Sequence, residues 1–205
     1  HYLSITGLNH PGRDQILDFQ STNWDEVVEK CTNRNFQEKI LSYQKHMAQH
    51  NLQGFDISWI KDVQNCILIR DPKHVIASYQ NKYPIQDERY LGYIQQAEII
   101  EFLEKENSTT PPIIDAHDIL KNPESMMKKL CKVLDIAFYP SMLSWPKGAR
   151  DSDGVWGPYW YKGVYDSTGF KPYTEKEVSL NNNLTDIYKS CNEYYDSFYK
   201  RRIKL

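Results

Sequence analysis

The sequence of 205 residues predicts an α/β fold, with a mainly parallel sheet and helices on both of its faces. Two short apolar runs, residues 66–69 and 111–116, are typical of strands in such a sheet, and the first has the unbroken apolar character of a strand buried on both faces. Between them, residues 87–106 carry apolar side chains at the spacing of a long amphipathic helix. Strands separated by helices of ten or more residues indicate βαβ units.

The other elements follow from the same periodicities. We expect a helix start at Asp14 and helical patterns at residues 24–31, 35–39, 52–63, 74–80, 123–134 and 180–203. A further strand is expected at residues 40–47, ending in Lys45 and His46. Residues 140–173 are rich in Gly, Pro, Trp and Tyr, and we interpret them as an ordered lid because aromatic side chains bury large apolar areas. The length suits a single domain over residues 1–205.

The composition argues against several classes of partner. A formal net charge of -2 gives no global field that would attract nucleic acid, and no apolar run approaches the ~20 residues of a membrane span. The cysteines lie far apart, without a C-x-x-C pair or a histidine at zinc-finger spacing. We therefore expect reduced thiols, a cytoplasmic location and no metal. The oligomeric state stays open.

The stretch CILIRDPKHVIASYQ, residues 66–80, begins as a strand and continues as a helix. Arg70 ends the strand, Pro72 suits the first turn of a helix, and Ser78 lies one or two turns further on. A guanidinium, a hydroxyl and free backbone amides together suit a doubly charged anion such as a phosphate monoester. In the alternative interpretation, Arg70 pairs with Asp71 or Asp115 and Ser78 only packs.

Three segments in order resemble the sulfotransferases that use 3′-phosphoadenosine 5′-phosphosulfate (PAPS). IRDPKHVIASY resembles their 3′-phosphate-binding element, DILKNPESMMKKLCKVLDI (residues 118–136) a later strand-turn-helix, and SYQKHMAQH (residues 42–50) the strand whose Lys and His flank the transferred group. The resemblance implies a three-layer, P-loop-like sheet and a sulfuryl transfer that releases PAP without a metal. It assigns the 3′-phosphate to Arg70 and Ser78, and it places Lys45 and His46 at the reaction.

The chain departs from the family pattern in two places. The Pro-Lys-x-Gly-Thr-like loop that holds the 5′-phosphosulfate is missing from the sequence and would lie before His1, so we expect an upstream segment. The closing Arg-Lys-Gly-x-x-Gly loop is also absent in its usual form. Residues 160–173 take its place in the order and offer cofactor contacts from Lys162, Ser167, Thr168, Gly169 and Lys171.

One further loop, GLNHPGRD at residues 7–14, imitates a nucleotide-binding G-x-x-x-x-G-K-[ST] motif. Asp14 replaces the hydroxyl residue of that motif and would repel phosphate, and no useful strand leads into the loop. We therefore interpret residues 7–14 as an ordinary turn and helix start.

In the implied chemistry His46 is the general base, since imidazole titrates near neutral pH, and Lys45 neutralises the bridging oxygen. His50 is the competing base, and a metal held by His46 and His50 is a weaker alternative. The acceptor pocket is expected to draw on aromatic residues and to favour a small apolar or ring-bearing acceptor. These residues are Trp145, Trp156, Tyr159, Trp160 and Tyr161. A kinase-like phosphoryl transferase and a non-catalytic nucleotide-binding domain remain as alternative functions.

Overall fold

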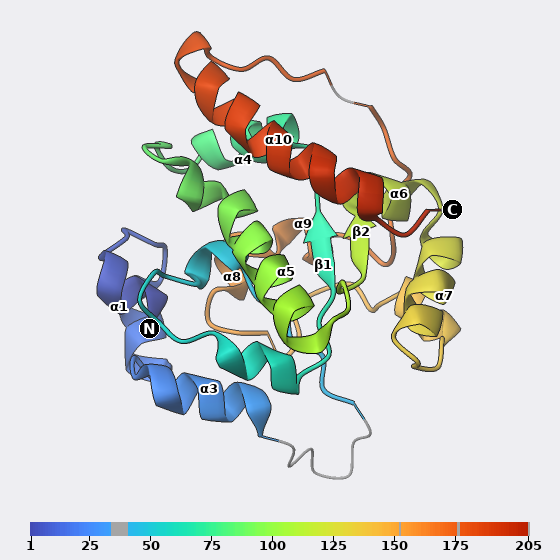
Figure 1. Ribbon diagram of the computed structural model, residues 1–205, viewed down its shortest axis with the longest axis horizontal. Helices are drawn as coiled ribbons and strands as arrows, with labels where there is room; N and C mark the ends of the chain where they lie inside the picture. The colour runs from blue at the N-terminus through green and yellow to red at the C-terminus, as the bar shows by residue number, and fades with distance from the viewer. Residues whose placement is uncertain (34–40, 152, 176, 205) are drawn as a thin grey trace.

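The computed structural model describes residues 1–33, 41–151, 153–175 and 177–204, and it has the expected mixture of helices and a parallel sheet (Figure 1). Strand β1 (Ile67–Ile69) pairs in parallel with β2 (Ile113–Asp115), and Ile67 lies opposite Ile113. The C-terminal tail passes beside β2, where the Ile203 amide donates a hydrogen bond of 2.8 Å to the Ile113 carbonyl oxygen. The predicted α/β class is therefore confirmed.

The connection from β1 to β2 is helical, as a parallel pair requires. It contains α4 (Pro72–Gln80), the 3₁₀ turn η3 (Glu88–Leu91) and α5 (Tyr93–Asn107). The single helix expected at residues 87–106 is wrong, since Gly92 has a φ of 85° and separates η3 from α5. A left-handed residue ends a helical turn, and glycine adopts that conformation without a steric penalty.

The core lies between the sheet, α5 and the long C-terminal helix α10 (Thr185–Arg201), which crosses α4 and α5 in Figure 1. One cluster of buried side chains joins both strands to α5 and α10, and it consists of Ile67, Ile69, Ile100, Ile113 and Phe198. A second cluster joins α4 to α10 and consists of Ile76, Leu91, Tyr93, Leu184 and Cys191. The inward face predicted for the C-terminal helix is therefore confirmed at Leu184, Cys191 and Phe198.

Two strand predictions are wrong. Leu68 is 53% exposed, so β1 is buried on one face only. Residues 41–47 have no regular secondary structure, and residue 40, at the start of the expected strand, lies outside the described residues. A strand at this position needs a neighbour to satisfy its backbone groups, and the described ladder joins only β1 and β2. The three-layer, P-loop-like arrangement therefore stays a prediction.

The helices expected at residues 24–31 and 123–134 are present, whereas only Ser58–Asp62 of the expected stretch 52–63 is helical, as a 3₁₀ turn. The N-terminal part contains α1 (Tyr2–Thr6), α2 (Arg13–Phe19), α3 (Trp24–Thr32), η1 (Ala48–His50) and η2 (Ser58–Asp62). After β2 come α6 (Ala116–Lys121), α7 (Pro123–Val133), η4 (Pro140–Leu143), α8 (Gly157–Trp160), α9 (Lys162–Tyr165) and η5 (Asn182–Leu184). The helix expected at residues 35–39 lies outside the described residues.

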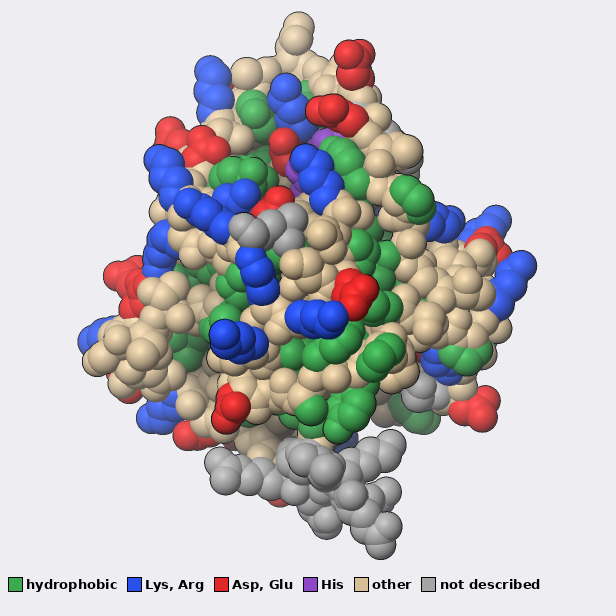
Figure 2. Space-filling model, turned by 90° about the vertical axis from the view of Figure 1, so that its right-hand side faces the viewer, with side chains coloured by type: hydrophobic (Ala, Val, Ile, Leu, Met, Phe, Trp, Pro, Cys, Tyr) green, Lys and Arg blue, Asp and Glu red, His purple; other side chains and the backbone are tan. Residues whose placement is uncertain are grey.

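The surface that carries α7 mixes apolar and charged side chains. Figure 2 shows this face, where hydrophobic side chains lie among scattered Lys, Arg, Asp and Glu side chains. Val133 and Tyr139 are both more than half exposed. Across residues 1–33, 41–151, 153–175 and 177–204, no helix is both long and apolar enough to cross a membrane.

Candidate active site

The junction of β1 and α4 has the local geometry that its sequence predicts. Arg70 follows the last residue of β1, and the Asp71 carboxylate accepts a hydrogen bond of 2.7 Å from the Lys73 amide as the N-cap of α4. Pro72 occupies the first turn, where its missing amide hydrogen costs nothing. Cap and proline together fix the point at which the strand becomes a helix.

A buried tyrosine holds the backbone of this junction. The Tyr93 hydroxyl donates a hydrogen bond of 2.6 Å to the Arg70 carbonyl oxygen, and Tyr93 is only 3% exposed. Burial strongly raises the pKa of Tyr93, so the hydroxyl keeps its proton at neutral pH. One turn further along α5, the Gln96 side-chain amide donates to the Leu68 carbonyl oxygen at 2.9 Å. Helix α5 therefore anchors both the strand and its end.

The Arg70 guanidinium is exposed, and within the described part of the chain it has no ion pair or hydrogen bond. Asp71 and Asp115, the acidic partners in the alternative interpretation, form hydrogen bonds with other groups. Asp71 caps α4, whereas the fully buried Asp115 accepts hydrogen bonds from the Tyr195 hydroxyl and from the backbone of α6. The alternative interpretation, in which Arg70 pairs with Asp71 or Asp115, is therefore wrong.

Ser78 is exposed on α4, seven residues after the N-cap. Seven residues are close to two helical turns, so Ser78 lies on the same side of α4 as Asp71 and about 10 Å further along the axis. The Lys73 ammonium, at the start of α4, lies 5.6 Å from the centre of the Tyr188 ring of α10. No hydrogen bond joins the side chains of Arg70 and Ser78 in the described part of the chain, and their shared role in binding stays a prediction.

Lys45 and His46 are exposed in the irregular segment 41–47. The imidazole Nε2 of His46 lies 3.0 Å from the side-chain oxygen of Gln44, and its ring is 5.6 Å from that of Trp59. Desolvation by neighbouring groups lowers the pKa of His46, which favours the neutral base at pH 7. Among the described residues, no hydrogen bond, ion pair or ring contact joins Lys45 or His46 to the Arg70 junction.

The competing base, His50, ends η1 and stacks on Tyr2, with ring centres 4.3 Å apart. Desolvation lowers the pKa of His50 first, and the nearby His10, His46 and Lys45 lower it further. Within the described ranges, no group of three or more His, Cys, Asp or Glu side chains is arranged to hold a metal ion.

Residues 160–173, which take the place of the family's closing loop and are called the closing segment below, are held by hydrogen bonds within the segment and to residues 144 and 145. Ser144 and Gly169 form an antiparallel bridge, and Ser167 is buried. The Ser167 hydroxyl donates to the Val164 carbonyl oxygen at 2.9 Å and accepts from the Trp145 indole at 3.3 Å. Thr168, Lys162 and Lys171 are exposed. The Ser167 hydroxyl, one of the predicted cofactor contacts, is therefore buried and already has one hydrogen-bond donor and one acceptor within the protein.

The GLNHPGRD loop is a turn between two helices. Gly7 ends α1 with a φ of 64°, and Gly12 precedes α2 with a φ of 74°. A phosphate-binding loop of the nucleotide type follows a strand, whereas α1 leads into this one. The prediction of an ordinary turn and helix start is confirmed.

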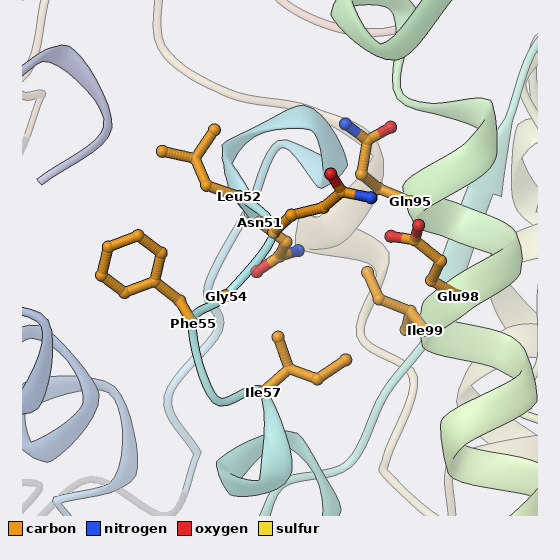
Figure 3. A pocket seen from close by; sticks show the side chains of 9 residues that line it. Asn51, Leu52, Gly54, Phe55, Ile57, Gln95, Glu98 and Ile99 are labelled. Atoms are coloured by element: carbon orange, nitrogen blue, oxygen red, sulfur yellow. The ribbon is translucent and has the colours of Figure 1, made fainter. Parts of the chain in front are cut away.

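A separate small pocket lies between α5 and the loop that precedes η2 (Figure 3). Its volume is about 220 Å³, and Gln95, Glu98 and Ile99 face the loop from α5. Glu98 binds both terminal nitrogens of Arg89 at 3.0 Å, and the Gln95 amide donates to the Arg89 carbonyl oxygen. Gln95 and Glu98, the two polar side chains of α5 in this pocket, therefore hold Arg89 of η3 in place.

Comparison with known proteins identifies the class. A family described as "Sulfotransferase domain" matches residues 1–202, so the chain belongs to the sulfotransferase domain family. Two curated proteins of Arabidopsis thaliana, branched-chain-amino-acid aminotransferase-like proteins 1 and 2, are 34% identical over 169 residues and 31% identical over 195 residues. These matches cover 82% and 95% of the chain.

The chain spans only about a third of these relatives, 30% and 34% of their lengths. No solved structure matches the chain.

Two features of the candidate site were missed from the sequence. The Tyr93 anchor lies 23 residues from Arg70, and a packing contact of this kind leaves no local pattern. The buried hydrogen bonds of Ser167 follow from the path of the closing segment, whereas its composition suggested only that the segment is ordered.

Proposed function

We propose that the chain transfers a sulfuryl group from PAPS to a hydroxyl or amine of a small acceptor and releases PAP. The observation that carries this proposal is the exposed Arg70, which is free of an acidic partner in the described part of the chain and follows β1 directly. A guanidinium binds two phosphate oxygens with strong, charge-assisted hydrogen bonds. Arg70 and Ser78 are the proposed ligands of the 3′-phosphate.

The fixed backbone at this junction supports such a role. The Tyr93 bond and the Asp71 cap hold the Cα of Arg70, so only its flexible side chain has to be ordered when a phosphate binds. A site that is organised before its ligand arrives loses less conformational entropy on binding. Exposed Thr168, with Lys162 and Lys171, would add contacts from the closing segment, together with the Gly169 backbone.

PAPS would supply the sulfuryl group, and the chain would have to position the acceptor and remove its proton. Neutral His46 is the proposed base, and Lys45 provides a positive charge beside it. A positioned base typically contributes ~10² to 10⁴ in rate. The aromatic residues of segment 140–173 suit a small acceptor with an apolar or aromatic body.

Calorimetry with PAP tests the proposed binding of the 3′-phosphate by Arg70 and Ser78, which is called the clasp below. We expect Arg70→Ala to weaken PAP binding at least tenfold, because a charge-assisted pair is lost, and Ser78→Ala to weaken it less. Lys132→Ala, which removes an exposed cation of α7, is the matched control and should bind PAP like the parent chain. Equal PAP affinity in the parent and Arg70→Ala would reject the clasp.

Turnover of labelled PAPS, measured on the longest natural form of the protein, separates an enzyme from a nucleotide-binding domain. PAP binding without turnover would favour the non-catalytic alternative, and magnesium-dependent binding of ATP in place of PAP would favour a kinase. Unchanged turnover in His46→Ala would reject His46 as the base.

A further inference from the structure

His74 lies on α4 between the two residues of the proposed clasp. It comes three residues after the N-cap Asp71 and four residues before Ser78. At 1.5 Å per residue, Ser78 lies about 6 Å beyond His74 along the helix axis and about 10 Å beyond Asp71. A phosphate group that is shared between Arg70 and Ser78 therefore passes the turn of α4 that carries His74.

His74 and Ser78 lie on the outer side of α4. The buried residues of this helix are Pro72 and Ile76. His74 is two residues away from each of them, and two residues rotate by about 200° around a helix, so His74 faces away from the core. Ser78 comes two residues after Ile76 and faces the same way. Residues four apart have their Cβ atoms about 5 to 6 Å from each other, so the imidazole and the hydroxyl are neighbours.

The imidazole of His74 is available to a ligand. His74 is half-buried, and in the described part of the chain its ring makes no hydrogen bond, ion pair or ring contact. Its ring nitrogens are not among the side-chain atoms that are buried without a partner, so they reach solvent. Its backbone amide serves the helix start, where it donates to the Asp71 carbonyl oxygen at 3.1 Å.

The charge of a phosphate monoester calls for more than one cationic group. Such a phosphate carries about 1.5 to 2 negative charges at neutral pH, whereas Arg70 supplies one positive charge. The Asp71 carboxylate, which caps α4, opposes the phosphate. Lys73 is exposed and has its ammonium near the Tyr188 ring of α10. A further donor that can carry a positive charge therefore strengthens the site, and an imidazole is such a donor.

We propose that His74 is a third ligand of the 3′-phosphate and determines the preference of the site for a nucleotide that carries this group. The proposal rests on the proposed function, because it needs the clasp. An imidazole N–H donates to one phosphate oxygen, while Arg70 and Ser78 bind the others. Three donors then match the three terminal oxygens of a phosphate monoester.

Calorimetry with PAP and with adenosine 5′-monophosphate (AMP), which lacks the 3′-phosphate, tests this role. We expect the parent chain to bind PAP at least tenfold more tightly than AMP. His74→Ala should weaken PAP binding about tenfold, because a hydrogen bond to a charged group is lost, and should leave AMP binding unchanged. His74→Arg keeps a charged donor and should retain most of the PAP affinity.

Lys105→Gln is the control for a general effect of charge. It removes an exposed cation of α5, and Lys105 comes twelve residues after the Tyr93 anchor. Twelve helical residues span about 18 Å, so this variant should bind PAP like the parent chain.

Circular dichroism shows whether each variant is folded. A folded His74→Ala variant that binds PAP like the parent, or that loses PAP and AMP affinity equally, would overturn the role of His74. If Arg70→Ala still weakens PAP binding in that case, the clasp stands and only the inference about His74 fails. Absence of PAP binding in the parent chain would overturn the clasp and the role of His74 together.

Discussion

The Tyr93 hydroxyl donates its hydrogen bond to the carbonyl oxygen of Arg70, 23 residues earlier in the chain. The bond ties the start of α5 to the end of β1, and at 2.6 Å it is a short hydroxyl-to-oxygen contact. The residue proposed to bind phosphate therefore has its backbone held from inside the core while its side chain remains exposed.

We predict that Tyr93→Phe destabilises the chain by about 1 kcal/mol, because the partly buried hydrogen bond to the Arg70 carbonyl oxygen is lost while the ring packing is kept. Urea denaturation followed by circular dichroism measures the loss. If the clasp is correct, PAP affinity should also fall, because Arg70 is then less well positioned. Tyr43→Phe, at a tyrosine that is 87% exposed, is the control and should change neither quantity. Unchanged stability in Tyr93→Phe would contradict the anchoring role.

The cap of α4 gives a second prediction. Asp71→Ala removes the acceptor of the Lys73 amide and should cost about 1 kcal/mol, whereas Asp71→Asn keeps an acceptor and should cost only a few tenths. Chemical denaturation of the two variants under the same conditions provides the comparison. Equal losses would mean that the negative charge of Asp71, and not its hydrogen bond, stabilises the helix.

His10 gives a pH-dependent prediction. The ring must be neutral to accept the Trp160 hydrogen bond, and the pKa of His10 is lowered in the folded chain. As the pH falls below about 6.5, the unfolded chain takes up this proton first, so the folded state loses stability. His10→Gln has an acceptor that does not titrate. We therefore expect the parent chain to lose stability relative to His10→Gln between pH 7.5 and pH 5, as measured by urea denaturation.

The comparison between variants is needed because the pKa values of His46 and His50 are also lowered. Those residues are present in both chains, so the difference isolates His10. In a Trp160→Phe background the indole donor is gone, and the advantage of His10→Gln at low pH should shrink. An advantage that did not change in this background would show that Trp160 is not the partner that matters.

The sequence predicted correctly those helices whose ends and buried faces are set by neighbouring residues, through caps, prolines and apolar spacing. Helix α7 begins where Asn122 caps it and Pro123 fills its first turn, and the apolar spacing of α10 places Cys191 and Phe198 in the core. The break at Gly92 could also have been predicted, since a glycine inside a helical pattern is a known stop.

The other wrong predictions depend on contacts between residues that are distant in sequence. Whether residues 41–47 form a strand depends on a neighbouring strand, and the apolar run of β1 could not reveal that Leu68 lies on an uncovered face. The start of α4 directly after Arg70, with Pro72 in its first turn, was predictable from the sequence. The Tyr93 anchor and the engagement of Asp115 by Tyr195 were not.

The last prediction concerns two arginines that are neighbours in sequence but differ in burial. Arg202 Nε lies 2.6 Å from the Asp118 carboxylate, and both side chains are only 13% exposed. Arg201 pairs with Glu104, and both of these side chains are 36% exposed. Removing one partner of a buried pair leaves an uncompensated charge, which typically costs about 3 to 5 kcal/mol, whereas an exposed pair is worth at most about 1 kcal/mol.

We therefore expect Arg202→Met to destabilise the chain several times more than Arg201→Met, as measured by denaturation at pH 7. Asp118→Asn combined with Arg202→Met removes the orphaned charge and should recover part of the loss. Similar small losses in both single variants would show that water reaches Asp118 and that the tail after α10 does not seal it. A large loss without recovery in the double variant would instead assign the effect to packing of Arg202 on the Tyr199 ring, which lies 3.4 Å from the guanidinium carbon.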